Sequence, residues 1–200
     1  DGGSTDKTLA ILNNLSQEYP NLKIVHMDEP AGYGNVLFNA IYATKGTHVV
    51  ILDSDGQFDL SDCIPMLDML LKNSLDVVTG YRKRKQDTFI RVYADRMLNL
   101  IVKLMFGINQ RDTNCALKLF KGEIIRNLYI ESKAWPTPTE VMIRLNALGY
   151  NVGEIGIRHY ERKGGESKLN VIRTSLEMLL FLIYIKFKLM LYRKNIIAKI

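Results

Sequence analysis

A short apolar stretch that ends at two acidic residues constrains the fold of this chain more than any other feature. Residues 49–52 are apolar and three of them are β-branched, which predicts a buried β-strand. Asp53 and Asp55 follow it. In an open α/β sheet, ligands bind beyond the carboxyl ends of the strands, so both carboxylates should stand at a site.

Two interpretations of this acidic pair remain open at this point. Carboxylate oxygens suit a divalent cation that carries a substrate phosphate. The same residues are also common in an ordinary acidic turn, in which Asp53 caps the segment that follows. The choice depends on what the rest of the chain places beside them.

The remaining hydrophobic patterns predict one α/β domain. Strand-like and helix-like segments alternate through the first 80 residues, which is typical of a parallel sheet covered by helices. Two hundred residues are enough for one domain with a sizeable core. Ser61 is expected to cap the helix that follows it. The expected strands are residues 22–27, 49–52, 76–80, 116–120 and 150–157, and the expected helices are residues 9–19, 35–44, 61–71, 89–106, 123–129 and 137–148.

Charge and cysteine content limit the classes of partner and site. The net charge is +6 at pH 7, which favours an anionic partner such as a nucleotide, a phospholipid surface or a nucleic acid. Cys63 and Cys115 are the only cysteines, which suits a reducing cytosol, and neither has metal-ligand spacing to a histidine. The chain begins at Asp1 within a loop-like segment, so we expect a fragment or a processed chain.

Two basic segments lie where an anion would bind. Four consecutive cations, residues 82–85, follow the strand expected at 76–80, on the same sheet edge as Asp53. A run of charge is usually a solvated face, but this position favours an anion-binding role. Residues 158–168 form a basic, glycine-containing segment, which can close over phosphates or simply connect two elements.

The C-terminal segment differs from the rest of the chain. Residues 178–185 are all apolar, cations follow them, and no acidic residue follows Glu177. This apolar run is far shorter than the ~20 residues that a transmembrane helix needs. An amphipathic basic helix over residues 170–200 would lie on an anionic membrane surface, or it would pack on a partner or on its own domain.

Several stretches match one set of motifs in their order and spacing. Residues 1–6 resemble Asp-Asp-Gly-Ser-Thr-Asp, residues 31–35 a Gly-rich loop before a helix, residues 53–57 Asp-x-Asp-Gly-Gln, residues 80–82 Gly-x-Arg, and residues 112–118 Asp-Thr-x-Cys-Gly-Phe-Lys. Arg91, Asn99 and Gly107 match a spaced Arg, Asn and Gly, and Arg162, Ser167 and Lys168 match a late Arg…Ser-Lys loop. Over nearly all its length the chain therefore resembles the inverting family-2 glycosyltransferases of the GT-A fold, especially the dolichol- or polyprenyl-phosphate mannosyltransferase-like branch.

The resemblance implies a fold and a donor site. The implied fold is α/β, a GT-A Rossmann-like mixed sheet with helices on both faces. The chain would then comprise a glycosyltransferase domain over residues 1–169, lacking its first strand, and the C-terminal helix over residues 170–200. Asp55 would hold Mg²⁺ or Mn²⁺, with Asp53 as a second ligand or on the ribose. The implied donor-binding residues are Asp1, Gly3, Asp6, Asp53 and Gln57.

The resemblance also implies roles at the acceptor. Arg82 and Arg91 would hold an acceptor phosphate, since the guanidinium fork matches phosphate oxygens. If the acceptor is instead a sugar hydroxyl, Asp112 or Glu140 becomes the candidate general base, although Glu140 equally suits the first turn of a helix. The residues that would close over the site are Arg162, Ser167 and Lys168.

Two residues depart from the family's motifs. Gly2 replaces the second Asp of the nucleotide loop. Asp95 stands where the lipid-phosphate branch commonly has Ser near the acceptor phosphate, and a carboxylate there repels a phosphate unless Arg91 or Arg96 pairs with it. The departure at Asp95 bears on the acceptor more than on the donor.

We therefore expect an inverting transferase that moves a hexose from GDP-mannose or a UDP-sugar to polyprenyl or dolichyl phosphate, peripheral or anchored at the cytosolic membrane face. One alternative is a family-2 transferase that acts on a saccharide hydroxyl in surface glycan synthesis. Another is a non-catalytic basic module that binds nucleic acid or membrane. Asp53 and Asp55 would oppose the phosphates of a nucleic acid, so no nucleic-acid partner is expected.

Overall fold

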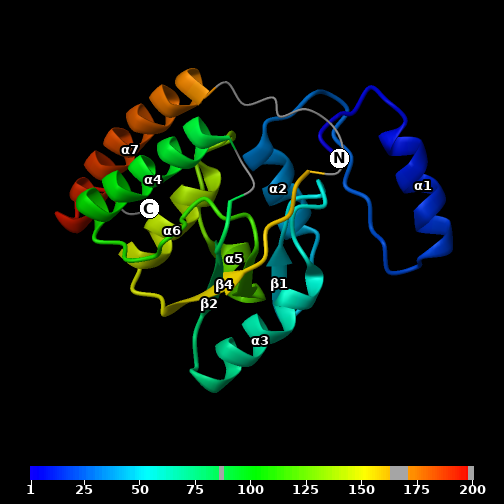
Figure 1. The fold of residues 1–200 in the computed structure, drawn as a ribbon, viewed down its shortest axis with the longest axis horizontal. Coiled ribbons are helices and arrows are strands. Elements are labelled where there is room, and N and C mark those ends of the chain that lie inside the picture. Colours follow the sequence, from blue (N-terminus) through cyan, green and yellow to red (C-terminus); the bar gives the residue numbers. More distant parts are fainter. Residues whose placement is uncertain (86–87, 163–170, 198–200) are drawn as a thin grey trace.

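A four-stranded sheet lies in the middle of the molecule, with helices around it (Figure 1). The computed structural model describes residues 1–85, 88–162 and 171–197. The strands are β1 (His48–Ile51), β2 (Val77–Arg82), β3 (Lys118–Lys121) and β4 (Val152–Ile157). The α-helices are α1 (Thr8–Glu18), α2 (Tyr33–Tyr42), α3 (Cys63–Lys72), α4 (Phe89–Phe106), α5 (Gly122–Asn127), α6 (Thr137–Ala147) and α7 (Val171–Arg193), and a short 3-10 helix covers Leu60–Asp62.

The order of the strands determines which loops meet. The order is β1-β3-β2-β4, in which β3 runs antiparallel to both of its neighbours and β2 runs parallel to β4. Lys118, the first residue of β3, lies opposite Ile51 at the end of β1 and opposite Thr79 in β2. The loop that enters β3 therefore reaches the sheet edge at which β1, β2 and β4 end.

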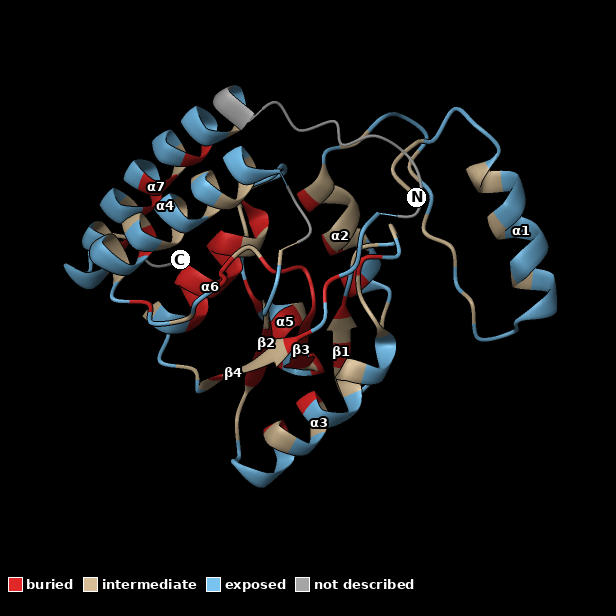
Figure 2. Ribbon diagram, viewed as in Figure 1, coloured by how far each residue is buried: buried red, intermediate tan, exposed pale blue. Residues whose placement is uncertain are grey.

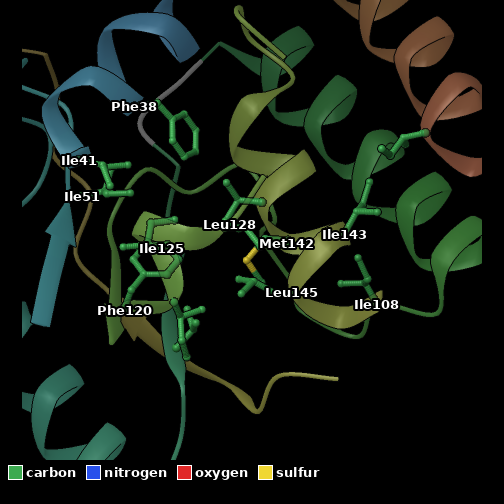
Figure 3. Packing of buried hydrophobic residues seen from close by; sticks show 14 of the residues in the cluster. Phe38, Ile41, Ile51, Ile108, Phe120, Ile125, Leu128, Met142, Ile143 and Leu145 are labelled. Carbon is green, nitrogen blue, oxygen red and sulfur yellow. The ribbon is translucent and has the colours of Figure 1, made fainter. Parts of the chain in front are cut away.

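Alternate residues of the strands supply two separate cores. Val77 and Phe120 belong to the larger cluster, which also contains side chains of α2, α4, α5, α6 and α7 and is shown in part in Figure 3. Val78 and Leu119 belong to a second cluster on the opposite face, where α3 packs. Each fully buried apolar side chain of this kind contributes roughly 1.5–3 kcal/mol. The predicted mixed α/β sheet with helices on both faces is confirmed.

Two local predictions are wrong. In the described part of the chain, residues 22–27 do not form a strand, and they pair with the backbone of Asp1. The amino group of Asp1 donates to the Val25 carbonyl oxygen (2.7 Å), and the Asp1 carbonyl oxygen accepts from the Met27 N–H (3.1 Å). A strand needs a longer ladder than this. Ser61 is not a helix cap. Its N–H donates to the Asp59 carboxylate at 2.8 Å, so Asp59 caps the start of the short 3-10 helix.

Helix α7 packs along α4 and closes the larger core (Figure 1). Its buried side chains recur every three or four residues, so they form one face of the helix. They are Met178, Leu182, Ile185 and Leu189. Apolar side chains also lie on the exposed sides of α4 and α7, which are largely pale blue in Figure 2. None of the helices in the described residues is long and apolar enough to cross a membrane.

The docking of α7 can be tested with two isoleucines of the same helix. Ile185 is fully buried in the core, whereas Ile183 is 55% exposed. Ile185→Ala should lower the free energy of unfolding by about 2–5 kcal/mol, because it leaves a cavity in the core. Ile183→Ala should change it by less than about 0.5 kcal/mol. Urea unfolding of both variants measures the difference, and equal losses would contradict the docking of α7.

Candidate active site

A cavity of about 640 Å³ opens at the sheet edge where β1 and β2 end. One end of it is polar. Asp53, Asp55 and Gln57 reach it from the turn after β1, and Arg82 and Lys85 reach it from the end of β2. The other end is an apolar wall from α4 and α7, formed by Ala94, Met97, Leu98, Ile101, Met178, Leu179 and Leu182.

The turn after β1 is tied to the segment after β4. Gly56 has φ 75°, a left-handed conformation that favours glycine. The turn is closed by the Gln57 N–H, which donates to the Asp55 carboxylate at 3.1 Å. The Gln57 side chain donates to the Tyr160 oxygen at 3.1 Å, and the Tyr160 N–H donates to the Gln57 oxygen at 3.0 Å. These bonds bring Arg162 over the acidic pair.

The two carboxylates of the turn lie in a setting that favours a positive charge. Asp53 accepts a hydrogen bond from the Tyr33 hydroxyl at 3.3 Å. Burial, and then the negative charge of Asp55, raise the pKa of Asp53. Arg162 forms an ion pair with Asp55, with 2.9 Å between Nη2 and Oδ2. In the described structure a guanidinium thus occupies the place beside Asp55 that suits a cation.

The two carboxylates would leave most coordination positions of a divalent cation to water or to a bound ligand. Within the described residues, no group of three or more His, Cys, Asp or Glu side chains could hold a metal by itself. Asp53 and Asp55 supply hard oxygen ligands, and Mg²⁺ or Mn²⁺ commonly takes its remaining ligands from water and substrate phosphates. The pair therefore suits a metal that arrives with a phosphorylated ligand.

Four charged side chains form a compact cluster beside the acidic pair. Arg82 binds Asp112 through two bonds, Nε to Oδ2 at 2.7 Å and Nη2 to Oδ1 at 2.9 Å. Its Nη2 also donates to Asp95 Oδ2 at 3.2 Å. The ammonium of Lys85 contacts Asp95 and lies 3.3 Å from Asp112. We name Arg82, Lys85, Asp95 and Asp112 the charge cluster.

Asp112 does not fit the role of a general base. Burial alone would raise the pKa of its carboxyl, but the bonds to Arg82 and the charges of Lys85 and Lys118 lower it to about 2. Its side chain is only 2% exposed. A carboxylate with so low a pKa is a poor proton acceptor near neutral pH. In the described structure Asp112 holds Arg82 in place, and a catalytic role for it stays a prediction.

Glu140 does not fit that role either. Its carboxylate accepts hydrogen bonds from the N–H groups of Glu131 (3.0 Å) and Ser132 (2.7 Å) and from Arg144 Nε (2.6 Å). The residue is fully buried and does not line the cavity. Glu140 is therefore a structural group that joins α6 to the segment before it.

The structure does not bring the predicted N-terminal donor residues into the cavity. Asp1 binds His26 Nδ1 at 2.7 Å and also contacts the Ser4 hydroxyl. Gly3 has φ 79° and packs against the backbone of Glu29, where a Cβ atom would clash. Asp6 accepts a hydrogen bond from the Thr8 N–H at 2.9 Å, in the turn before α1. These three residues lie outside the cavity lining.

Of the other predicted residues, Arg91 lines the cavity from α4. Ser167 and Lys168 lie outside the described residues.

The sequence alone did not predict an aromatic wall, in which Tyr33 and Trp135 stack with their ring centroids 5.7 Å apart beside Asp53. Burial, followed by the charge of Asp53, raises the pKa of Tyr33, so its hydroxyl stays protonated. In the sequence, the one feature that could have pointed to this aromatic wall is Trp135, the chain's only tryptophan.

Comparison with known proteins identifies the family. The sequence profile of glycosyl transferase family 2 matches residues 1–130, well over half of the chain. The chain belongs to glycosyl transferase family 2. The metal and nucleotide motifs of the sequence and the cavity at the carboxyl ends of β1 and β2 are typical of this family's GT-A fold.

Three relatives of this family 2 chain are named for lipid-phosphate sugar transfer. Dodecaprenyl-phosphate galacturonate synthase of Rhizobium johnstonii is 26% identical, over 94% of this chain and 57% of its own length. Undecaprenyl-phosphate 4-deoxy-4-formamido-L-arabinose transferase of an Enterobacter species is 30% identical, over 86% and 52%. Dolichyl-phosphate beta-glucosyltransferase of Dictyostelium discoideum is 23% identical, over 96% and 62%. The chain thus spans little more than half the length of these relatives.

Solved structures confirm the fold. Glucosyl-3-phosphoglycerate synthase of Mycobacterium tuberculosis in complex with phosphoglyceric acid has a TM-score of 0.64 at 19% identity, over 91% of this chain and 66% of its own. The same synthase in complex with Mn²⁺ and UDP-glucose has a TM-score of 0.62 at 19% identity, with the same coverage. The fold of this family 2 chain is therefore GT-A.

The guanidinium of Arg162 should compete with a metal ion for Asp55. Without nucleotide, Arg162→Ala should therefore tighten Mn²⁺ binding by roughly 3–10-fold, because it removes a cation from the binding place. Arg158→Ala is the matched control: Arg158 pairs with Asp59 (3.0 Å) and Asp62 (3.1 Å), outside the cavity. Arg158→Ala removes the same charge as Arg162→Ala and should leave the Mn²⁺ affinity unchanged. Electron paramagnetic resonance of free Mn²⁺ gives both affinities, and equal effects would contradict the competition.

Proposed function

We propose that this family 2 glycosyltransferase moves a hexose from a nucleotide-diphosphate sugar to a polyprenyl phosphate. The observation that carries the proposal is the composition of one cavity. It joins a pair of carboxylates, a cluster with two cations and an apolar wall. A sugar nucleotide, a phosphate and an isoprenoid chain need these three surfaces together.

The donor would bind at Asp53 and Asp55. When bound there, Mg²⁺ or Mn²⁺ would neutralise the charge that grows on the departing nucleoside diphosphate. Asp55 and Asp53 would hold the cation, and the stacked rings of Tyr33 and Trp135 offer a flat surface beside it. Arg162 would move from Asp55 to the donor phosphates once the cation takes its place. The structures of the synthase with Mn²⁺ and UDP-glucose support metal use in this fold.

The acceptor would lie along α4 and α7. Seven apolar side chains of these two helices line the cavity and can bury the first isoprene units. The acceptor phosphate would then lie beside Arg91, Arg82 and Lys85, at the junction of the apolar wall and the donor site. The three relatives act, by their names, on dodecaprenyl, undecaprenyl and dolichyl phosphates, which supports this acceptor class.

The surroundings of the two predicted bases favour a phosphate acceptor over a sugar hydroxyl. Asp112 is buried in ion pairs and Glu140 is buried in hydrogen bonds away from the cavity. A hydroxyl acceptor needs a base to remove its proton, whereas a phosphate monoester is already ionised near neutral pH. The charge cluster therefore supports an acceptor that arrives with its negative charge in place.

The exposed apolar side chains of α4 and α7 favour a place at the cytosolic face of a membrane, where such an acceptor resides. Both helices form one side of the molecule (Figure 2). Apolar side chains at a bilayer surface, beside cations, bind anionic lipid. The exposed apolar residues include Phe89, Ile90, Tyr93, Leu100 and Leu104 of α4, and Leu176, Leu180, Ile183 and Phe187 of α7.

A transfer assay tests the proposal. The full-length protein that contains this chain should transfer label from a UDP- or GDP-hexose to undecaprenyl phosphate in detergent, with Mn²⁺ and not with EDTA. Asp55→Asn should lower kcat by at least about 100-fold, because the metal loses a charged ligand. Asp68→Asn, at an exposed position of α3, is the control and should retain full activity. Transfer to phosphoglycerate or to an oligosaccharide, but not to the prenyl phosphate, would contradict the proposal.

A further inference from the structure

Asp95 is a carboxylate placed among the cations that a phosphate acceptor needs. It reaches the cavity from α4, where it binds Arg82 Nη2 at 3.2 Å and contacts the ammonium of Lys85. Its side chain is 15% exposed, whereas that of Asp112 is 2% exposed. Both carboxylates bind the same two cations, but Asp95 lines the cavity and Asp112 does not. Asp95 is therefore the member of the pair that an incoming anion can replace.

Within the charge cluster itself, the cations and the carboxylates are equal in number. Two cations, Arg82 and Lys85, face two carboxylates, Asp95 and Asp112. Asp112 receives two bonds from the guanidinium of Arg82 and one from its backbone N–H, while Asp95 receives one from the guanidinium. An acceptor phosphate must therefore compete with Asp95 for both cations before it can bind.

Other charged groups reach the cavity from several elements. Arg91 comes from α4 itself, Asp53 and Asp55 come from the turn after β1, and Arg162 comes from the segment after β4. The described residues of α7 that line the cavity are uncharged; they are Thr174, Ser175, Met178, Leu179 and Leu182. The charge cluster therefore provides the cations nearest to Asp95 in this cavity, together with Arg91 on its own helix.

We propose that Asp95 makes the acceptor end of the cavity selective for a doubly charged phosphate. This inference rests on the proposed function. An anion with one charge gains no more from Arg82 and Lys85 than Asp95 already does, so it does not displace the carboxylate. A phosphate monoester carries −1.5 to −2 at pH 7 and outcompetes it. Asp95 is thus a specificity-determining residue that favours phosphate monoesters over phosphate diesters.

Binding of two matched probes to the full-length protein tests this role without any transfer step. Farnesyl phosphate is a monoester, and its methyl ester is a diester that carries one charge at any pH above ~2. Calorimetry at pH 7.5 should show that the dissociation constant of the wild-type protein is at least about 10-fold lower for the monoester than for the diester. Asp95→Asn should tighten diester binding and reduce this preference to about 3-fold or less. Asp95→Glu retains the charge and should keep the preference.

The pH dependence separates selectivity from a merely structural role. The second pKa of a phosphate monoester is ≈ 6, so wild-type affinity for farnesyl phosphate should fall steeply between pH 7 and 5 as the dianion is lost. In Asp95→Asn the affinity should fall much less, since a singly charged phosphate then binds as well. Diester affinity should show no such fall in either protein.

Two results would overturn the inference in different ways. In the first result, Asp95→Asn binds both probes tightly with an unchanged preference, or it loses affinity for both probes equally. Asp95 would then only position Arg82 and Lys85, and the proposed function would remain intact. Failure of the wild-type protein to bind either probe at any pH would refute the prenyl phosphate acceptor itself, and the selectivity with it.

Discussion

The ion pair between Arg82 and Asp112 is the interaction on which the site depends. It joins the last residue of β2 to the loop that enters β3, with 2.7 Å between Nε and Oδ2. It is possible because β3 lies antiparallel between β1 and β2, so that its entry loop meets the edge at which the other strands end. The same edge receives Asp53 and Asp55 from β1 and Arg162 from β4. One topological feature thus gathers a cation site, a charge cluster and a cavity.

The chemistry follows from how these charges are compensated. Of the two carboxylates after β1, Asp55 forms an ion pair with Arg162, and the charge of Asp55 also acts on Asp53. The pair therefore favours a cation. The carboxylate of Asp112 is fully compensated, which lowers its pKa to about 2 and removes it as a base. Asp95 lies between these cases: it is compensated, yet it borders the cavity. A carboxylate pair that suits a metal, beside an Asp112 held in ion pairs, suits an acceptor that carries its own negative charge.

Local patterns were enough to predict much of the fold. Helix α4 has the predicted bounds, because its amphipathic pattern ends at Gly107, which adopts φ 71°. The strand before Asp53 was predicted to within one residue, because its run of β-branched apolar residues is local as well. Contacts between distant segments could not be predicted in this way. The sequence offered Arg91 or Arg96 as partners of Asp95, whereas the contacts with Arg82 and Lys85 depend on how α4 lies against the sheet. The stack of Tyr33 on Trp135 and the single-residue pairing of segment 22–27 are non-local in the same sense.

We propose that Asp53 and Asp55 form the donor site of this family 2 chain. Calorimetric titration of UDP and GDP into the full-length protein, first with Mn²⁺ and then with EDTA, tests it most directly. The account predicts binding of one of the two nucleotides with Mn²⁺, and a loss of at least about 10-fold in affinity both with EDTA and in Asp55→Asn, because the metal then loses a charged ligand or is absent. Equal affinity with and without metal, unchanged by Asp55→Asn, would contradict the account.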